Sequence, residues 1–201
     1  MSYDYDVFLS YRRLNEWPQW VDRQFLPLFR HWLGEELGRK PSIFVDREGI
    51  QSGDSWPLRL AKAHSTSRVL VGLWSRTYFE STWCQAELAR MLARHQICGI
   101  PTPSLPQGLI HAAVLHDGDT FPEAIETIQT VDLTSCASVR IARDSPTAEE
   151  LERRIKSWVP GIAHSIGAAP EYDSSWLHEA AEAFLRLLVP KSIVPALPRL
   201  G

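Results

Sequence analysis

The sequence predicts an α/β fold, in which a doubly wound sheet of five parallel strands carries helices on both faces and a C-terminal helical extension follows. Two observations support this fold. Short apolar runs recur along the chain, and amphipathic helical patterns separate them. Strands that alternate with helices favour a parallel sheet, because the crossover helix returns the chain to the same end of the sheet. The predicted strands are 5–11, 42–46, 68–74, 109–116 and 131–133, the last at an edge.

Helices are predicted between these strands. Apolar residues recur at helical spacing across 20–38, where Pro27 predicts a kink or two helical pieces and Gly38 a C-terminal stop. A polar loop, 47–54, precedes a helix that is capped by Asp54 or Ser55 and ends near His64. The remaining predicted helices are 75–95, with Ser75 as its cap, and 121–128.

Beyond residue 133 the alternation of predicted strands and helices ends. Residues 147–150, Thr-Ala-Glu-Glu, form a capping-box pattern ahead of an apolar-periodic helix. We expect one domain over 1–160, followed over 161–201 by a linker, an amphipathic helix and a proline-rich tail. The linker is predicted at 161–170 and the helix at 176–189.

Composition limits the classes of function. The chain has 201 residues and a formal net charge of −3, which gives no electrostatic reason to expect nucleic acid or an anionic membrane as a partner. No apolar segment approaches the ~20 residues that span a bilayer. Three cysteines, an odd number without paired spacing, argue against a disulfide framework. We therefore expect a cytoplasmic protein.

The stretch that follows the third predicted strand carries the candidate chemistry. On a helix, Cys84 falls within an apolar stripe, and Glu87 and Trp83 lie four residues apart on its edge. In open α/β sheets, ligands bind at the carboxyl end of the strands, which is where this helix begins. By helix geometry alone, the simpler interpretation is that Trp83 packs in the core and Glu87 is a solvated flank.

Several common kinds of active site are excluded by their missing motifs. The chain has no Gly-x-Gly-x-x-Gly, no phosphate loop of the Walker type and no Gly-x-Ser-x-Gly elbow. Its seven histidines include no His-Glu-x-x-His, and Cys-x-x-Cys is absent, so we predict no metal. A Cys84 nucleophile is disfavoured, since a thiol in an apolar stripe is usually inert.

Three sequence blocks together resemble the Toll/interleukin-1 receptor (TIR) domain family. They are Tyr-Asp-Val-Phe-Leu-Ser-Tyr-Arg-Arg at 5–13, Ser-Ile-Phe-Val-Asp-Arg-Glu-Gly-Ile-Gln-Ser-Gly-Asp at 42–54 and Trp-Cys-x-x-Glu-Leu at 83–88. The resemblance covers most of 4–135. It implies the flavodoxin-like version of the doubly wound fold.

The resemblance also implies a reaction, because the chain is most similar to the bacterial branch that cleaves NAD⁺. In that branch a glutamate at the position of Glu87 is catalytic, and Phe44 would line the nucleotide pocket. Ser10 and Arg12 look like the enzymatic members, Ser75 lies on the same predicted rim, and Trp83 could stack on the base. The reaction would need no metal and no cofactor besides NAD⁺ as substrate.

The same resemblance implies partners. Enzymatic members often complete the pocket with a loop from a second copy, so we expect a homo-oligomer switched on by assembly, in antiphage defence. A separate sensor or effector protein is a further expected partner. Two alternatives remain open at this point. One is a non-enzymatic TIR adaptor, which generally lacks the glutamate, and the other is an enzyme similar to nucleoside deoxyribosyltransferases.

Overall fold

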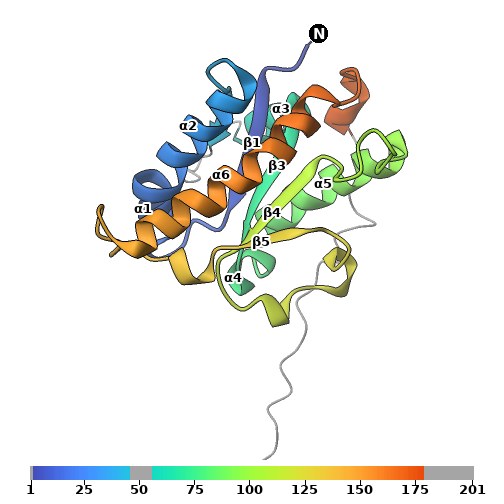
Figure 1. The fold of residues 1–201 in the computed structure, drawn as a ribbon. Coiled ribbons are helices and arrows are strands. Elements are labelled where there is room, and N and C mark those ends of the chain that lie inside the picture. The colour runs from blue at the N-terminus through green and yellow to red at the C-terminus, as the bar shows by residue number, and fades with distance from the viewer. Residues whose placement is uncertain (1, 46–55, 179–201) are drawn as a thin grey trace, which may run out of the picture.

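The fold is a parallel sheet with helices on both faces (Figure 1). The computed structural model describes residues 2–45 and 56–178. The sheet has the strand order β2-β1-β3-β4-β5, and every pairing is parallel. This confirms the predicted five strands and the edge position of the last one. The strands are β1 (Tyr5–Tyr11), β2 (Ile43–Val45), β3 (Ser67–Trp74), β4 (Ile110–Val114) and β5 (Thr130–Asp132).

Strand β1 lies inside the sheet and is almost entirely buried. Phe8 is paired in register with Phe44 of β2 and with Leu70 of β3. Side chains alternate along a strand, so Ser10 points to the same face as Phe8. The ring of Phe8 packs against His64 of α3 (Trp56–Ser65), which identifies that face as the one covered by α3. Ser10, a polar residue near the end of β1, therefore points to the sheet face that α3 covers.

The opposite face is covered by the helical segment after β1 and by α6 (Pro146–Gly167), which lie side by side (Figure 1). The segment is continuous but changes its winding: α1 (Trp17–Trp20) passes into a π-helix, η1 (Val21–Phe25), and then into α2 (Leu26–Leu37). Pro27 thus lies in the first turn of α2, where its missing N–H costs little. Gly38 ends α2 in the left-handed conformation, as predicted.

The predicted single helix 75–95 is wrong, because the chain forms two helices there. They are α4 (Arg76–Phe79), capped by Ser75, and α5 (Thr82–Cys98), capped by Ser81. Each serine accepts a hydrogen bond from the backbone N–H three residues later. A second capping side chain allows the chain to change direction and begin a new helix.

The predicted helix 121–128 is also wrong. A 3₁₀ turn, η3 (Glu123–Ile125), lies in this region; another, η2 (Gly118–Thr120), precedes it, and η4 (Thr134–Cys136) follows β5. Pro122 and the β-branched Ile125, Thr127 and Ile128 give the segment weak helix propensity. Strands β4 and β5 are consequently joined without an α-helical layer.

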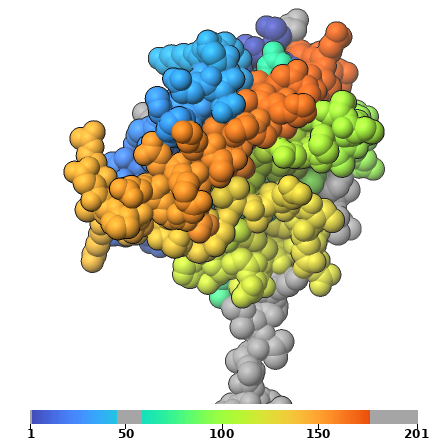
Figure 2. Space-filling model, in the orientation of Figure 1, coloured from blue at the N-terminus to red at the C-terminus, as the bar shows by residue number. Residues whose placement is uncertain are grey.

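Helix α6 runs across the boundary expected between residues 160 and 161. It begins at Pro146, directly before the expected capping box, with Ser145 as its cap, and it continues through Pro160 to Gly167. The predicted linker at 161–170 is therefore mostly helix. Helix α6 lies against α2 (Figure 2). Buried side chains on both sides of the proline hold it against α2 and the sheet, which offsets the roughly 3 kcal/mol cost of an interior proline. These side chains are Leu151, Ile155, Trp158, Val159, Ile162 and Ile166.

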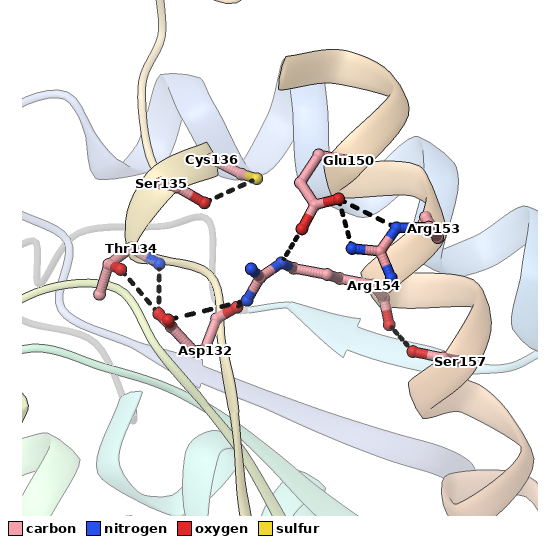
Figure 3. Close-up of polar contacts among 8 residues, drawn as sticks. All are labelled: Asp132, Thr134, Ser135, Cys136, Glu150, Arg153, Arg154 and Ser157. Atoms are coloured by element: carbon pink, nitrogen blue, oxygen red, sulfur yellow. Dashed lines mark hydrogen bonds and ion pairs between the residues drawn. The ribbon is translucent and has the colours of Figure 1, made fainter. Parts of the chain in front are cut away.

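A polar network ties α6 to the edge strand β5 (Figure 3). Arg154 donates to the backbone carbonyl of Asp132 and lies 3.7 Å from its carboxylate. On its other side, Arg154 donates a 2.5 Å hydrogen bond to Glu150, which also accepts from Arg153. Arg154 thus bridges the two elements, whereas Arg153 pairs within the helix.

The segment after α6 packs back on the domain. The ring of Trp176 lies 6.1 Å from that of Tyr3 and covers the guanidinium of Arg94 at 4.3 Å. Arg94 itself is fully buried and donates to carbonyls at the end of α3 and the start of β3. A 3₁₀ turn, η5 (Ser174–His178), begins where the helix 176–189 was expected, and most of that helix lies outside the described residues. The loop 47–54 and the proline-rich tail lie outside them as well.

Candidate functional site

The candidate site lies at the carboxyl end of β1 and β3. In the order β2-β1-β3-β4-β5 these two central strands lead to opposite faces of the sheet, and a doubly wound sheet binds its ligands at this switch point. Ser10 is the penultimate residue of β1, Ser75 directly follows β3, and α5 starts nearby. Sheet topology therefore brings the predicted site residues to the edge where ligands are expected.

A chain of hydrogen bonds links Glu87 to the buried interior. The hydroxyl of Ser10 donates to Glu87 Oε2 at 2.5 Å, and the Ser10 oxygen lies 2.9 Å from the hydroxyl of Tyr78. Since the Ser10 proton is directed at the carboxylate, the Tyr78 hydroxyl is the donor in the second bond. Complete burial raises the pKa of Tyr78 well above its usual value, so Tyr78 keeps the proton that it donates.

Glu87 is half-buried, whereas Ser10 and Tyr78 beneath it are buried. The carboxylate is therefore held from the protein side by a neutral donor, at the border between the interior and solvent. A charge-assisted hydrogen bond of this kind fixes the orientation of the carboxyl group.

Trp83 lies one helical turn before Glu87 on α5 and is 39% exposed. The simpler interpretation of Trp83 as core packing is therefore wrong. An indole that presents its ring at the surface beside a carboxylate can contact a planar ligand.

Ser75 and Arg12 act on the helices that carry the site. Ser75 caps α4 by accepting from the backbone N–H of Tyr78, so it fixes the residue that supports Ser10. Arg12 donates a 2.9 Å hydrogen bond to the hydroxyl of Ser81, the cap of α5. In the structure, both predicted residues thus contact the frame around Glu87 rather than its carboxylate.

Phe44 belongs to a neighbouring aromatic layer. Its ring stacks on Phe8 with centroids 5.2 Å apart, and it meets Tyr5 edge-on at 5.3 Å. Phe44 is buried on the same sheet face as Ser10, one strand away. The structure thus places Phe44 on the sheet face that carries Ser10, within a buried aromatic layer.

Two further side chains behind Glu87 have strongly shifted pKa values. Burial, reinforced by the charge of Glu87, raises the pKa of the Cys84 thiol, so Cys84 stays protonated and is a poor nucleophile. Burial and the nearby Arg94 and Arg90 lower the pKa of His64, and the neighbouring Glu87 backbone opposes this shift only in part. A neutral His64 thus supports the helix without adding charge to the site.

Close packing beneath Ser10 depends on a glycine. Gly72 of β3 is paired with Ser10, and a Cβ at this position would lie only 2.3 Å from Nε1 of Trp74. The indole of Trp74 fills that space and packs against Phe79 and Tyr78 at 5.5 and 6.3 Å. Because Gly72 has no side chain, the indole of Trp74 can pack here and support Tyr78.

Sequence reasoning missed Tyr78 and Ser81. A signal for Ser81 was present, since Ser81-Thr82 places capping residues directly ahead of the Trp83–Cys98 pattern. Tyr78 gave no comparable signal, because a tyrosine in an aromatic-rich helix usually packs in a core. In the described part of the chain, no group of three or more His, Cys, Asp and Glu side chains is placed to hold a metal ion.

A family model described as "TIR domain" matches residues 7–145, which is more than half of the chain. The chain belongs to the TIR domain family. The match includes every predicted site residue of this TIR domain, from Ser10 to Glu87. It ends at Ser145, so α6 and the segment that packs behind it lie beyond the match.

Two solved TIR structures illustrate the similarity. The TIR domain of the Toll-related receptor TRR-2 from Hydra magnipapillata is 18% identical, with a TM-score of 0.42, over 64% of this chain and 83% of its own. The TIR domains of the activated Roq1 resistosome, which directly recognises the pathogen effector XopQ, are 20% identical, with a TM-score of 0.40, over 80% of this chain and 84% of their own. Among the described residues of the present TIR domain, no helix has both the length and the apolar character to cross a bilayer.

Proposed function

We propose that this TIR domain cleaves the bond between nicotinamide and ribose in NAD⁺, with Glu87 as the catalytic residue. The observation that carries the proposal is the 2.5 Å hydrogen bond from Ser10 to Glu87 at the switch point of the sheet. It holds a carboxylate at the binding edge, beside an exposed indole. The products would be nicotinamide and ADP-ribose or a cyclic isomer of ADP-ribose.

The chemistry needs little more than one carboxylate. The nicotinamide of NAD⁺ is cationic and leaves as a neutral base, so no acid is required to protonate it. The ribose develops positive charge at its anomeric carbon, as in glycoside hydrolysis. A carboxylate that faces this carbon, or accepts hydrogen bonds from the ribose hydroxyls, stabilises the transition state more than the ground state.

Ser10 and Tyr78 would act as positioning residues. The serine hydroxyl occupies Oε2 and orients the carboxyl group, and the tyrosine hydroxyl keeps the serine turned toward it. Both are buried, so the geometry exists before any ligand binds. Trp83 is the residue of this group that is exposed enough to stack on the substrate.

We further propose that assembly of several copies controls the reaction, in antiphage defence, together with a separate sensor or effector protein. The TIR family membership and the expectations from the NAD⁺-cleaving branch support this part. Exposure of Trp83 and Leu14, each 39% exposed, is compatible with contacts between copies.

Release of nicotinamide tests the proposal. The full chain is incubated with NAD⁺, with and without a crowding agent that favours assembly, and nicotinamide is quantified. Glu87→Gln keeps the size of the side chain but removes its charge, and we expect turnover to fall by at least about 100-fold. The matched control is Glu80→Gln, an exposed glutamate whose ion pair with Arg76 lies on α4 and its C-cap.

The control should retain its turnover. If wild type and Glu87→Gln release equal amounts of nicotinamide, or if neither releases any in either condition, Glu87 is not catalytic. The same surface would then be assigned to docking between TIR domains. Exchange of bases on deoxynucleosides would instead favour a deoxyribosyltransferase.

A further inference from the structure

A cavity lies at the other end of the sheet from Glu87. It has a volume of about 380 Å³ and is bounded by the C-terminal half of α5, the middle of α6 and the starts of β4 and β5. Loop residues 101–108 and the turn before β5 close its sides. Figure 2 shows α6, the loop and this turn meeting on the face toward the viewer.

The cavity follows from the irregular connection between β4 and β5. Strand β5 begins opposite Ala112, so the first two residues of β4, Ile110 and His111, extend beyond it within the described sheet. No α-helix covers this corner in the described part of the chain, because the connection forms 3₁₀ turns. Helices α5 and α6, which lie on opposite faces of the sheet, and the uncovered start of β4 therefore enclose the cavity.

The walls of this cavity are neutral. Among the described residues that line it, none is Asp, Glu, Lys or Arg. Its two histidines are held uncharged: burial lowers the pKa of both His95 and His111 to about 4. An anion or cation would lose its hydration there without meeting an opposite charge, which disfavours charged ligands strongly.

Apolar and polar groups are nevertheless both present. Leu92, Ile128 and Trp158 supply flat apolar surface, and the polar side chains are amides, hydroxyls and imidazoles. His111 is 5% exposed, and its Nε2 has no hydrogen-bond partner among the described residues. A buried polar atom of this kind is usually paired. Because His111 lines the cavity, a ligand there would pair with this atom once the imidazole turns toward it.

The side chain of Gln107 packs against α6 at Gly161. Gly161 of α6 has no side chain, and a Cβ built there would lie 2.3 Å from Oε1 of Gln107. The amide therefore rests against the helix backbone at the border of the cavity. On the opposite wall, Nε2 of His95 accepts a hydrogen bond from the backbone N–H of Leu109, so that ring is already fixed.

We propose that this cavity binds an uncharged nitrogen heteroaromatic compound of one or two rings, with an amide or ring N–H for His111 and Gln107. The volume is at the small end of the range for ligand pockets, which suits a ligand of this size. This site is distinct from Glu87, and its occupancy does not depend on cleavage of NAD⁺.

Two probes of equal shape test the charge requirement. Nicotinamide and nicotinate differ by an amide against a carboxylate, and each is titrated into ¹⁵N-labelled Glu87→Gln protein, in which the proposed catalytic carboxylate is neutralised. We expect nicotinamide to shift the amide signals of Gly108 and Ile110 in a saturable manner. Nicotinate should bind at least about tenfold more weakly, since its carboxylate must be desolvated.

Two glycines of α6 provide matched variants. Gly161→Ala adds a methyl group against Gln107, whereas Gly167→Ala adds one where no atom lies within 4 Å. Both remove a glycine of α6, Gly161 inside the helix and Gly167 at its last position. We expect Gly161→Ala to weaken nicotinamide binding several-fold and Gly167→Ala to leave it unchanged.

The proposal is overturned if nicotinate binds as tightly as nicotinamide, if nicotinamide leaves the signals around His111 unshifted, or if Gly161→Ala and Gly167→Ala bind equally well. Because binding is measured in the Glu87→Gln background, the outcome is separate from that of the cleavage assay.

Discussion

Ser10 and Glu87 are separated by 77 positions in the chain, and a 2.5 Å hydrogen bond joins their side chains. One comes from the end of a central strand and the other from the second turn of a helix on the same sheet face. The bond therefore forms only when the β1–β3 pairing and the docking of α5 are both complete. The orientation of the Glu87 carboxylate therefore depends on the complete fold.

Ser10→Ala removes the donor to Glu87 Oε2 but leaves the carboxylate in place. Hydrogen bonds to charged groups contribute about 1.5–3 kcal/mol, so we expect kcat for NAD⁺ cleavage to fall roughly 10- to 100-fold. KM should change little, because Ser10 is buried and orients Glu87 rather than the substrate. Steady-state kinetics with purified variants measures both quantities.

Tyr78→Phe completes a double-mutant cycle with this variant. If Tyr78 acts only through Ser10, the double variant should be no slower than Ser10→Ala alone. Additive losses would contradict the directed chain of hydrogen bonds from Tyr78 to Glu87.

Arg154→Ala should loosen the edge strand β5. Arg154 connects α6 to the backbone and side chain of Asp132, whereas Arg153 contacts Glu150 on its own helix. We expect a loss of about 1 kcal/mol in the free energy of unfolding for Arg154→Ala and almost none for Arg153→Ala, because exposed pairs within a helix contribute little. Urea denaturation measures the two losses.

Amide exchange locates the effect of Arg154. Faster exchange confined to Thr130–Asp132 and its neighbours on β4 is the expected pattern. Equal exchange in the Arg153 and Arg154 variants would show that the bridge to β5 is energetically unimportant.

Stability should fall as the pH is lowered from about 6.5 to 4. His111 has a folded-state pKa of about 4 because burial penalises its charged form, whereas an unfolded histidine has a pKa near 6.5. In this interval the unfolded chain binds more protons, so protonation draws the protein toward unfolding. The stabilisation from an uncharged His111 is complete above pH 6.5 and is lost progressively below it, and the loss reaches about 3 kcal/mol by pH 4.

Unfolding free energies of wild type and His111→Gln at pH 7 and pH 5 test this dependence. The variant lacks the group that titrates, so its loss between the two pH values should be smaller than that of wild type by about 2 kcal/mol. His116→Gln, at an exposed position, controls for the removal of one imidazole. An identical loss in wild type and His111→Gln would contradict the assignment.

Much of the fold could be predicted from sequence because its strands are short apolar runs that end in polar residues. Ser10 and Ser75 each follow such a run, and parallel strands bring these ends to one edge. The pairing of Ser10 with Glu87 could not be predicted in this way, since helix period places Glu87 beside Trp83 but says nothing of a strand 77 positions away. The resemblance to TIR domains placed both residues among the expected site residues, but it did not predict the hydrogen bond between them.

The errors have local causes that sequence patterns describe poorly. The linker expected from residue 161 implied that the helix ends before it, yet tertiary packing on both sides of this point carries α6 onward to Gly167. Continuous helical periodicity from 75 to 95 concealed the break before Ser81, because one capped turn hardly changes the apolar pattern. Packing and capping, rather than propensity, decided both outcomes.

The contact between Arg94 and Trp176 has a practical consequence for anyone who wishes to shorten this protein. The family match ends at residue 145, but the indole that covers the buried guanidinium arrives 31 positions later. A truncation chosen by family boundaries would remove that cover, along with the whole of α6, and would expose the face of the sheet on which α6 lies. The smallest piece that should fold independently therefore extends at least to Trp176.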